Sequence, residues 1–159
     1  VLEGPDYMWI DEKGFEDDPY VVYLFQELGK SAQTLKGYTN DIRINKFSAD
    51  ILDDTDYEKI KAAGIVDTNV EHVEKVVEFV PKGTSKATGI AWLCDYLGVD
   101  CADTYAVGDS VNDLDMLTYV GHGIAMGNAS QPAKDAAEYV TTDIHEDGIM
   151  HAMEHYELI

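Results

Sequence analysis

The segment 107–117, Val-Gly-Asp-Ser-Val-Asn-Asp-Leu-Asp-Met-Leu, constrains this chain more than any other stretch. The short apolar run at residues 104–107 predicts a strand, and the residues after it predict a loop and then a helix. Open α/β sheets bind their ligands outside the carboxyl ends of the strands, so we expect this loop to hold a ligand. Asp109 and Asp113 are four residues apart and can face one hard cation that prefers oxygen ligands. The segment therefore predicts a magnesium and phosphate site.

The same residues also have a purely structural interpretation. Asp and Ser are common N-cap residues, and Asn112 and Asp113 suit the first turn of a helix, where negative charge opposes the helix dipole. Lys86 by itself would be a solvated lysine near the start of another helix, and Asn128 would be a turn residue that tolerates a positive φ. The motif taken alone does not decide between capping a helix and binding a metal.

The charge balance narrows the classes of partner. Eleven Lys and Arg residues against 31 Asp and Glu residues leave a formal net charge of -20. Such a chain repels polyanions, so we expect neither nucleic-acid binding nor binding to an anionic membrane. The two cysteines, Cys94 and Cys101, form no CxxC pair, and no signal-peptide pattern or long apolar run is present, which indicates a cytoplasmic protein. No pattern indicates the oligomeric state.

The two halves of the chain differ in the order of their strand and helix patterns. Residues 1–79 mix short strand and helix patterns without a nucleotide or metal motif, which is typical of an accessory α+β domain. They include an acidic loop at 11–18, helices at 19–28 and 53–63, and strands at 7–10, 41–47 and 73–80. Residues 80–159 alternate strands with helices, which predicts an α/β domain with a parallel sheet and right-handed crossovers. Strands are expected at 104–107, 122–126 and 139–140, and helices at 85–97, 110–119, 132–138 and 147–156.

Three blocks of the second half carry a resemblance to a known family: Pro-Lys-Gly-Thr-Ser-Lys-Ala at 81–87, Gly-Asp-Ser-Val-Asn-Asp-Leu-Asp-Met-Leu at 108–117 and Ile-Ala-Met-Gly-Asn-Ala at 124–129. They resemble the haloacid dehalogenase superfamily, in its Cof-like subgroup with a large α+β cap. An Asp-Gly pair at 147–148 also falls where that subgroup has one near its end. The resemblance covers about half of the chain closely.

The resemblance implies a Mg²⁺-dependent phosphatase with a Rossmann-like parallel-sheet core and a cap that sets specificity for small phosphorylated metabolites, above all sugar phosphates. On the matching positions, Asp109 would ligate the metal and Asp113 would ligate it or bind one of its waters. Lys86 would neutralise the phosphate and the attacking group. Asn112 would orient Lys86 or a phosphate oxygen, and Asn128 would line the substrate pocket.

One element of the family pattern has no match in these residues. Such enzymes attack phosphate with the first aspartate of an Asp-x-Asp-Gly-Thr motif that follows an apolar strand, and form an aspartyl-phosphate. The Asp-x-Asp at 54–56 is followed by Tyr57 and lies in the cap-like half. We therefore expect about a hundred preceding residues, with the nucleophile, to be absent here, and residues 1–159 alone to be inactive. The alternatives are a non-catalytic binding module of the same fold and a phosphosugar mutase.

Overall fold

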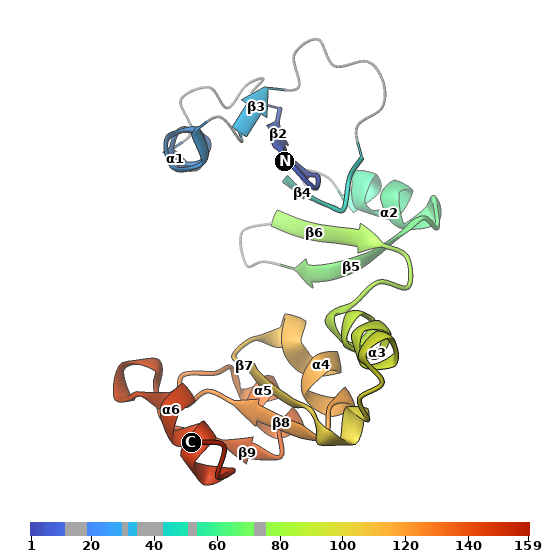
Figure 1. Ribbon diagram of the computed structural model, residues 1–159. Coiled ribbons are helices and arrows are strands. Elements are labelled where there is room, and N and C mark those ends of the chain that lie inside the picture. The colour runs from blue at the N-terminus through green and yellow to red at the C-terminus, as the bar shows by residue number, and fades with distance from the viewer. Residues whose placement is uncertain (12–18, 30–31, 35–42, 51–53, 72–75) are drawn as a thin grey trace. The chain divides into compact units, whose positions relative to one another are not determined.

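The computed structural model describes residues 1–11, 19–29, 32–34, 43–50, 54–71 and 76–159. The chain divides into two compact units, Val1–Lys82 and Gly83–Ile159 (Figure 1). The acidic loop expected at 11–18 lies outside the described residues except for Asp11. Residues 41–42 and 73–75 of two expected strands lie outside them as well.

The first unit contains a six-stranded sheet with the order β3-β2-β1-β4-β6-β5. Neighbouring strands are antiparallel except β2 and β3, which are parallel. Three of the strands, β1, β3 and β5, are not predicted by the sequence patterns. The elements are β1 Leu2–Glu3, β2 Met8–Ile10, α1 Pro19–Leu28, β3 Ala32–Thr34, β4 Lys46–Asp50, α2 Asp54–Ala62, β5 Val66–Glu71 and β6 Val76–Pro81.

The described residues of the first unit form two buried clusters. The ring of Phe79 is fully buried and stacks on Phe47, the neighbouring residue across β4 and β6, at 4.7 Å between centroids. Ile10 is buried in the second cluster, against Val21 and Phe25 of α1. These two residues are four apart, so they lie on one face of the helix, as its apolar spacing predicts.

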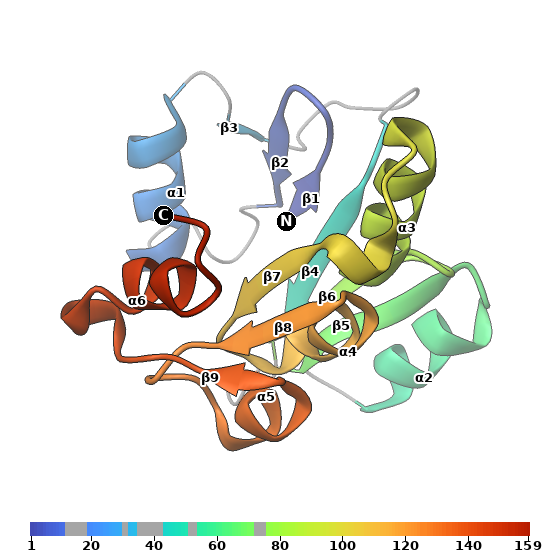
Figure 2. The same ribbon diagram turned by 60° about the horizontal axis from the view of Figure 1, so that its bottom comes forward.

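The second unit contains a parallel three-stranded sheet with the order β7-β8-β9, which confirms the predicted parallel sheet. Figure 2 shows the three strands side by side, with α4 and α5 next to them. The elements are α3 Lys86–Leu97, β7 Tyr105–Gly108, α4 Leu114–Tyr119, β8 His122–Ala125, α5 Gln131–Ala136, β9 Tyr139–Val140 and α6 Gly148–His155, with 3-10 turns at Cys101–Asp103, Val111–Asp113 and Ile144–Glu146.

One buried cluster joins α4, β8 and α5. Leu117 of α4 packs with Ala125 of β8 and Ala133 of α5, and the two alanines are fully buried. Small side chains at these positions let the helices lie close to the sheet, and this packing holds the segment between β7 and α4 in place.

The division between the units falls three residues after the predicted boundary at 79/80. Strand β6 continues to Pro81 and pairs with both β4 and β5, so its last residues belong to the first unit. The assignment of the first unit as a cap and of the second as a catalytic core remains a prediction. Among the described residues, no helix has the length and apolar character that crossing a membrane requires.

Gly121 marks a close approach of two backbone segments in the second unit. Its N–H donates to the carbonyl oxygen of Cys101 at 2.9 Å. A Cβ atom at this position would lie 1.8 Å from the carbonyl oxygen of Ala102. Only glycine permits this contact, so Gly121 fixes the 3-10 turn Cys101–Asp103 against the start of β8.

We expect Gly121→Ala to lower the free energy of unfolding by about 1–3 kcal/mol, because the turn must move away from the strand. The matched control is Gly89→Ala inside α3, where an added Cβ meets no atom within 4 Å. Alanine is the better helix former, so this variant is expected to gain about 0.5–1 kcal/mol. Urea unfolding followed by circular dichroism measures both, and equal stability of the two variants would contradict the constraint at Gly121.

Candidate functional site

The loop after β7 lies at the carboxyl edge of the parallel sheet, as predicted. Gly108 ends β7 and is paired with Ala125, the last residue of β8. Backbone hydrogen bonds then join the two loops that leave these strands. Met126 donates to Gly108 at 3.0 Å, and Ser130 donates to Asp109 at 2.8 Å. The Asp109 loop is therefore held by main-chain contacts on the side where open α/β sheets bind ligands.

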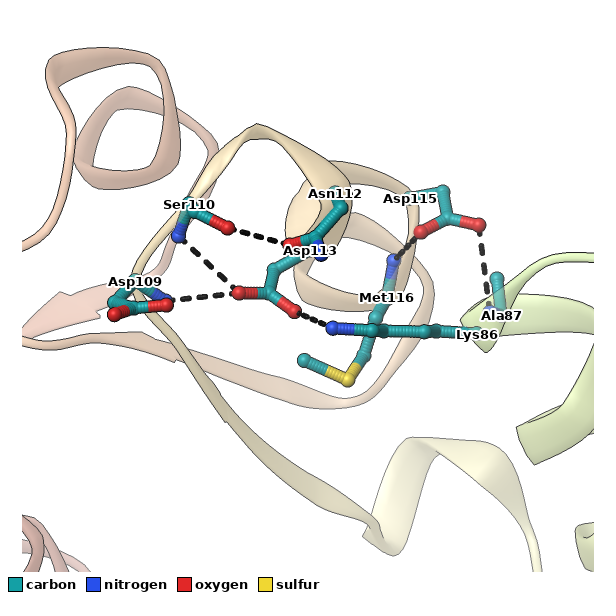
Figure 3. A network of polar contacts seen from close by, with 8 residues as sticks. All are labelled: Lys86, Ala87, Asp109, Ser110, Asn112, Asp113, Asp115 and Met116. Carbon is teal, nitrogen blue, oxygen red and sulfur yellow. Dashed lines mark hydrogen bonds and ion pairs between the residues drawn. The ribbon is translucent and has the colours of Figure 1, made fainter. Parts of the chain in front are cut away.

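Asp113 is the centre of the polar network in this loop. It ends the 3-10 turn Val111–Asp113, and only 4% of its surface is exposed. Its Oδ1 forms an ion pair with Nζ of Lys86. Its Oδ2 accepts from the backbone N–H of Asp109 at 2.9 Å and of Ser110 at 3.2 Å (Figure 3). Three donors thus hold one buried carboxylate.

These contacts determine the charge of Asp113. Burial by itself raises the pKa of the carboxyl group, but the hydrogen bond from Lys86, the two backbone donors and the positive charge of Lys86 outweigh it. The net effect lowers the pKa below its ordinary value, so Asp113 is ionised at neutral pH. A depressed pKa stabilises the folded state above the ordinary pKa, and this contribution is lost as the pH falls through the folded-state pKa.

Gly108 makes room for this carboxylate. A Cβ atom at position 108 would lie 2.7 Å from Cβ and 2.8 Å from Cγ of Asp113. Any side chain there would push Asp113 away from its donors. The glycine before the first aspartate of the motif is thus required by the packing of the second one.

Lys86 reaches Asp113 from the first turn of α3. Ser85 caps this helix: its side chain accepts from the N–H of Thr88 at 3.2 Å, while the Thr88 hydroxyl accepts from the N–H of Ser85 at 2.8 Å. This reciprocal pair is a capping box that fixes where the helix begins. Lys86 follows this cap directly, and its ammonium group is held by the ion pair with Asp113. Its side chain is 46% exposed.

The other two polar residues of the motif have different environments. The side chain of Asp109 is exposed and makes no hydrogen bond or ion pair with the residues that the structure describes. Asn112 is half-buried, and its Oδ1 accepts from the Ser110 hydroxyl. Within the described part of the chain, it forms no hydrogen bond with Lys86. The described residues thus leave the Asp109 carboxylate unengaged. The contact to Ser110 agrees with a structural role for Asn112, and its predicted role in orienting Lys86 or a phosphate oxygen stays a prediction.

Asn128 lies in the loop after β8. Its Oδ1 accepts from the backbone N–H of Ile144 at 3.0 Å, which ties this loop to the 3-10 turn Ile144–Glu146. Neither Lys86 nor Asp113 contacts its side chain in the described residues. The contact to Ile144 agrees with a structural role, and the predicted role in lining a substrate pocket stays a prediction.

Asp115 belongs to the same network, although no role for it was predicted. Its Oδ1 accepts from the N–H of Met116 at 2.7 Å, and its Oδ2 accepts from the N–H of Ala87 in α3 at 3.4 Å (Figure 3). The only signal in the sequence is a third carboxylate within the motif. Its partner is 28 residues away and becomes visible only when α3 and α4 pack together.

The loop offers carboxylate oxygens, which are the ligands that a hard cation such as Mg²⁺ prefers, but few of them. Mg²⁺ binds one or two carboxylates and completes its shell with waters and substrate phosphate. Among the described residues, the carboxylate of Asp109 has no hydrogen-bond or ion-pair partner, while both oxygens of Asp113 already accept hydrogen bonds. Within the described residues, no group of three or more His, Cys, Asp and Glu side chains gathers in a way that could hold a metal ion. Among the described residues, the loop therefore offers a single carboxylate without a hydrogen-bond partner, and its role as a metal ligand stays a prediction.

Several known proteins resemble this chain. A stretch of 82 residues is 38% identical to the 5-amino-6-(5-phospho-D-ribitylamino)uracil phosphatase YcsE of Bacillus subtilis. This stretch covers 52% of this chain and 33% of that protein. A solved structure described as a sugar phosphatase of HAD subclass IIB has a TM-score of 0.65 and 30% identity, over 74% of this chain and 45% of that one. A haloacid dehalogenase-like hydrolase from Bacteroides thetaiotaomicron has a TM-score of 0.76 and 26% identity, over 98% and 59%.

The chain thus spans about a third of the curated relative and about half of the solved structures. The family model for haloacid dehalogenase-like hydrolases matches residues 2–153, which is nearly the whole chain and includes both units. The resemblance drawn from the three motif blocks is thereby confirmed, and the chain belongs to the haloacid dehalogenase-like hydrolases.

Proposed function

We propose that the complete protein is a Mg²⁺-dependent phosphatase that hydrolyses small phosphorylated metabolites, with sugar phosphates as the first class to test. One observation carries this proposal: an ion pair between Lys86 and the buried Asp113 lies beside the free carboxylate of Asp109, at the carboxyl edge of the sheet. Phosphoryl transfer requires positive charge around the phosphate and a fixed position for it.

Each of the three side chains has a distinct task in this proposal. Asp109 would hold the Mg²⁺ ion, which, when bound, neutralises the charge that develops on the phosphate oxygens. Asp113 holds the ammonium group of Lys86 in place and would bind a metal water. Lys86 presents a compact positive charge that lowers the repulsion between an anionic substrate and an anionic attacking group.

The attacking carboxylate is proposed to lie outside these 159 residues. Asp54 and Asp56 belong to the first turn of α2, and Asp56 pairs with Lys59 at 3.0 Å. Asp113 and Asp115 are engaged by Lys86 and by the N–H of Ala87. Asp56, Asp113 and Asp115 do not directly follow a strand, and both the YcsE phosphatase and the sugar phosphatase structure are considerably longer than this chain. Both observations support a nucleophile on a further segment.

The substrate class rests on the relatives rather than on the described residues. One relative is named as a phosphatase of a phosphoribityl compound and another as a sugar phosphatase, so both descriptions name phosphorylated compounds of the sugar or ribityl type. We propose the same class here, with the first unit acting as the cap that selects among substrates.

Asp109→Ala in the complete protein is expected to lower the Mg²⁺-dependent hydrolysis of p-nitrophenyl phosphate by at least about 100-fold, because the metal loses its free carboxylate ligand. The matched control is Asp103→Ala, which removes an exposed carboxylate from the 3-10 turn Cys101–Asp103. Removal of the metal with EDTA should abolish turnover in the wild type, and added Mg²⁺ should restore it. Unchanged turnover in Asp109→Ala would refute the assignment.

Residues 1–159 alone are expected to show no metal-dependent turnover, because positioning without a nucleophile cannot form the covalent intermediate. Steady-state assays with p-nitrophenyl phosphate and with hexose phosphates check this. Turnover by these residues alone would contradict a nucleophile on another segment.

In the complete protein, a strand that ends in Asp-x-Asp-Gly-Thr supports the enzyme, and its absence supports a binding module. An isomerised rather than hydrolysed hexose phosphate would identify a mutase.

A further inference from the structure

Asp115 links two helices of the second unit close to the proposed site. It lies in the first turn of α4, two residues after Asp113, and it is partly buried. One of its carboxylate oxygens accepts from its neighbour Met116 at 2.7 Å, which fixes the orientation of the group. The other oxygen faces the N–H of Ala87, the residue that directly follows Lys86, at 3.4 Å.

The N–H groups in the first turn of a helix have no acceptor within that helix. In α3, the Ser85 side chain accepts from the N–H of Thr88, and the Ser85 carbonyl oxygen accepts from the N–H of Gly89. The N–H of Ala87 donates to the Asp115 carboxylate instead. The negative charge of Asp115 also lies near the positive end of the α3 dipole, where the positive charge of Lys86 is unfavourable. Asp115 therefore offsets the electrostatic cost of a lysine in this first turn.

Two neighbouring residues of α3 are thus held by two neighbouring carboxylates of the motif. Lys86 is held through its side chain by Asp113, and Ala87 is held through its backbone by Asp115 (Figure 3). A lysine side chain has four rotatable bonds, so the ion pair alone leaves the helix free to shift. The backbone contact adds the second point of attachment, which fixes the start of α3 relative to the motif loop.

We propose that Asp115 is a positioning residue for Lys86: it holds the first turn of α3 in the place from which the lysine reaches the phosphate site. This proposal rests on the proposed phosphatase function for its effect on turnover, but the effect on Lys86 itself is independent of any activity. Asp115 does not touch the substrate and acts only through α3.

The test compares variants of the complete protein in two measurements. Asp115→Asn keeps the size of the side chain but offers one acceptor oxygen to two N–H groups, and Asp115→Ala offers none. Asp115→Glu keeps the charge and both oxygens. Asp95→Asn is the matched control, because it makes the same change on α3 at an exposed residue whose side chain forms no hydrogen bond or ion pair in the described part of the chain.

The first measurement is the acetylation of Lys86 by a trace of acetic anhydride, quantified by peptide mass spectrometry relative to Lys134 of α5. A loosened lysine reacts faster, so Asp115→Asn and Asp115→Ala are expected to raise the ratio by roughly threefold. Asp115→Glu should lie closer to the wild type, and Asp95→Asn should not change it. An unchanged ratio in both Asp115→Asn and Asp115→Ala overturns the proposal.

The second measurement is the kcat of Mg²⁺-dependent hydrolysis of p-nitrophenyl phosphate, with folding checked by circular dichroism. Asp115→Asn is expected to lower kcat by about tenfold, since a displaced charged group loses much of its effect on the transition state. Asp115→Glu should recover part of the loss. Raised acetylation with an unchanged kcat overturns the positioning role. If the wild type itself shows no hydrolysis, the phosphatase proposal fails, while the acetylation result still decides whether Asp115 holds Lys86.

Discussion

The ionised carboxylate of Asp113 inside the second unit is the constraint on which the rest of the site depends. A buried charge is costly unless it is paired and hydrogen-bonded, and here Lys86 and the N–H groups of Asp109 and Ser110 fulfil both conditions. Each donor comes from a different local structure: the first turn of α3, the end of β7 and the start of a 3-10 turn. The absence of a side chain at Gly108 lets the carboxylate reach all three. One charge thereby fixes the relative positions of a helix, a strand and a loop.

The two edges of the parallel sheet are built from different chemistry. The carboxyl edge carries the charged network, whereas the first residues of the three strands, Tyr105, His122 and Tyr139, carry rings at the opposite edge. Tyr105 stacks on His122 at 4.6 Å between centroids, and Tyr156, which follows α6, lies 5.1 Å from Tyr105 and 5.0 Å from His122. Aromatic packing can thus anchor the last helix at one edge while the other edge keeps exposed polar groups for a ligand.

Local signals in the sequence predicted the second unit well because its elements follow local rules. The strand patterns and the alternation of strands with helices, which predicted the parallel sheet, depend on residues close together in the chain. Length alone does not explain the missed strands: β1 and β3 are two and three residues long, but β9 and β2 are equally short and were predicted. Asp115 and Ala87 are 28 residues apart, and a carboxylate alone does not indicate which N–H it will meet. The spacing of the motif identified the charged residues, but it did not predict which group each of them contacts.

Asp109 and Asp113 show why the capping and metal-site interpretations of the motif do not exclude each other. The two carboxylates are chemically identical and four residues apart, yet one is exposed without a partner among the described residues and the other is buried with three donors. Asp113 stabilises the turn by accepting from its N–H groups, as a capping residue does, and the same contacts keep it ionised beside Lys86. Because Asp113 meets the structural demands of the loop, Asp109 keeps a carboxylate that no described residue engages, and this is the carboxylate that the proposed metal site would use.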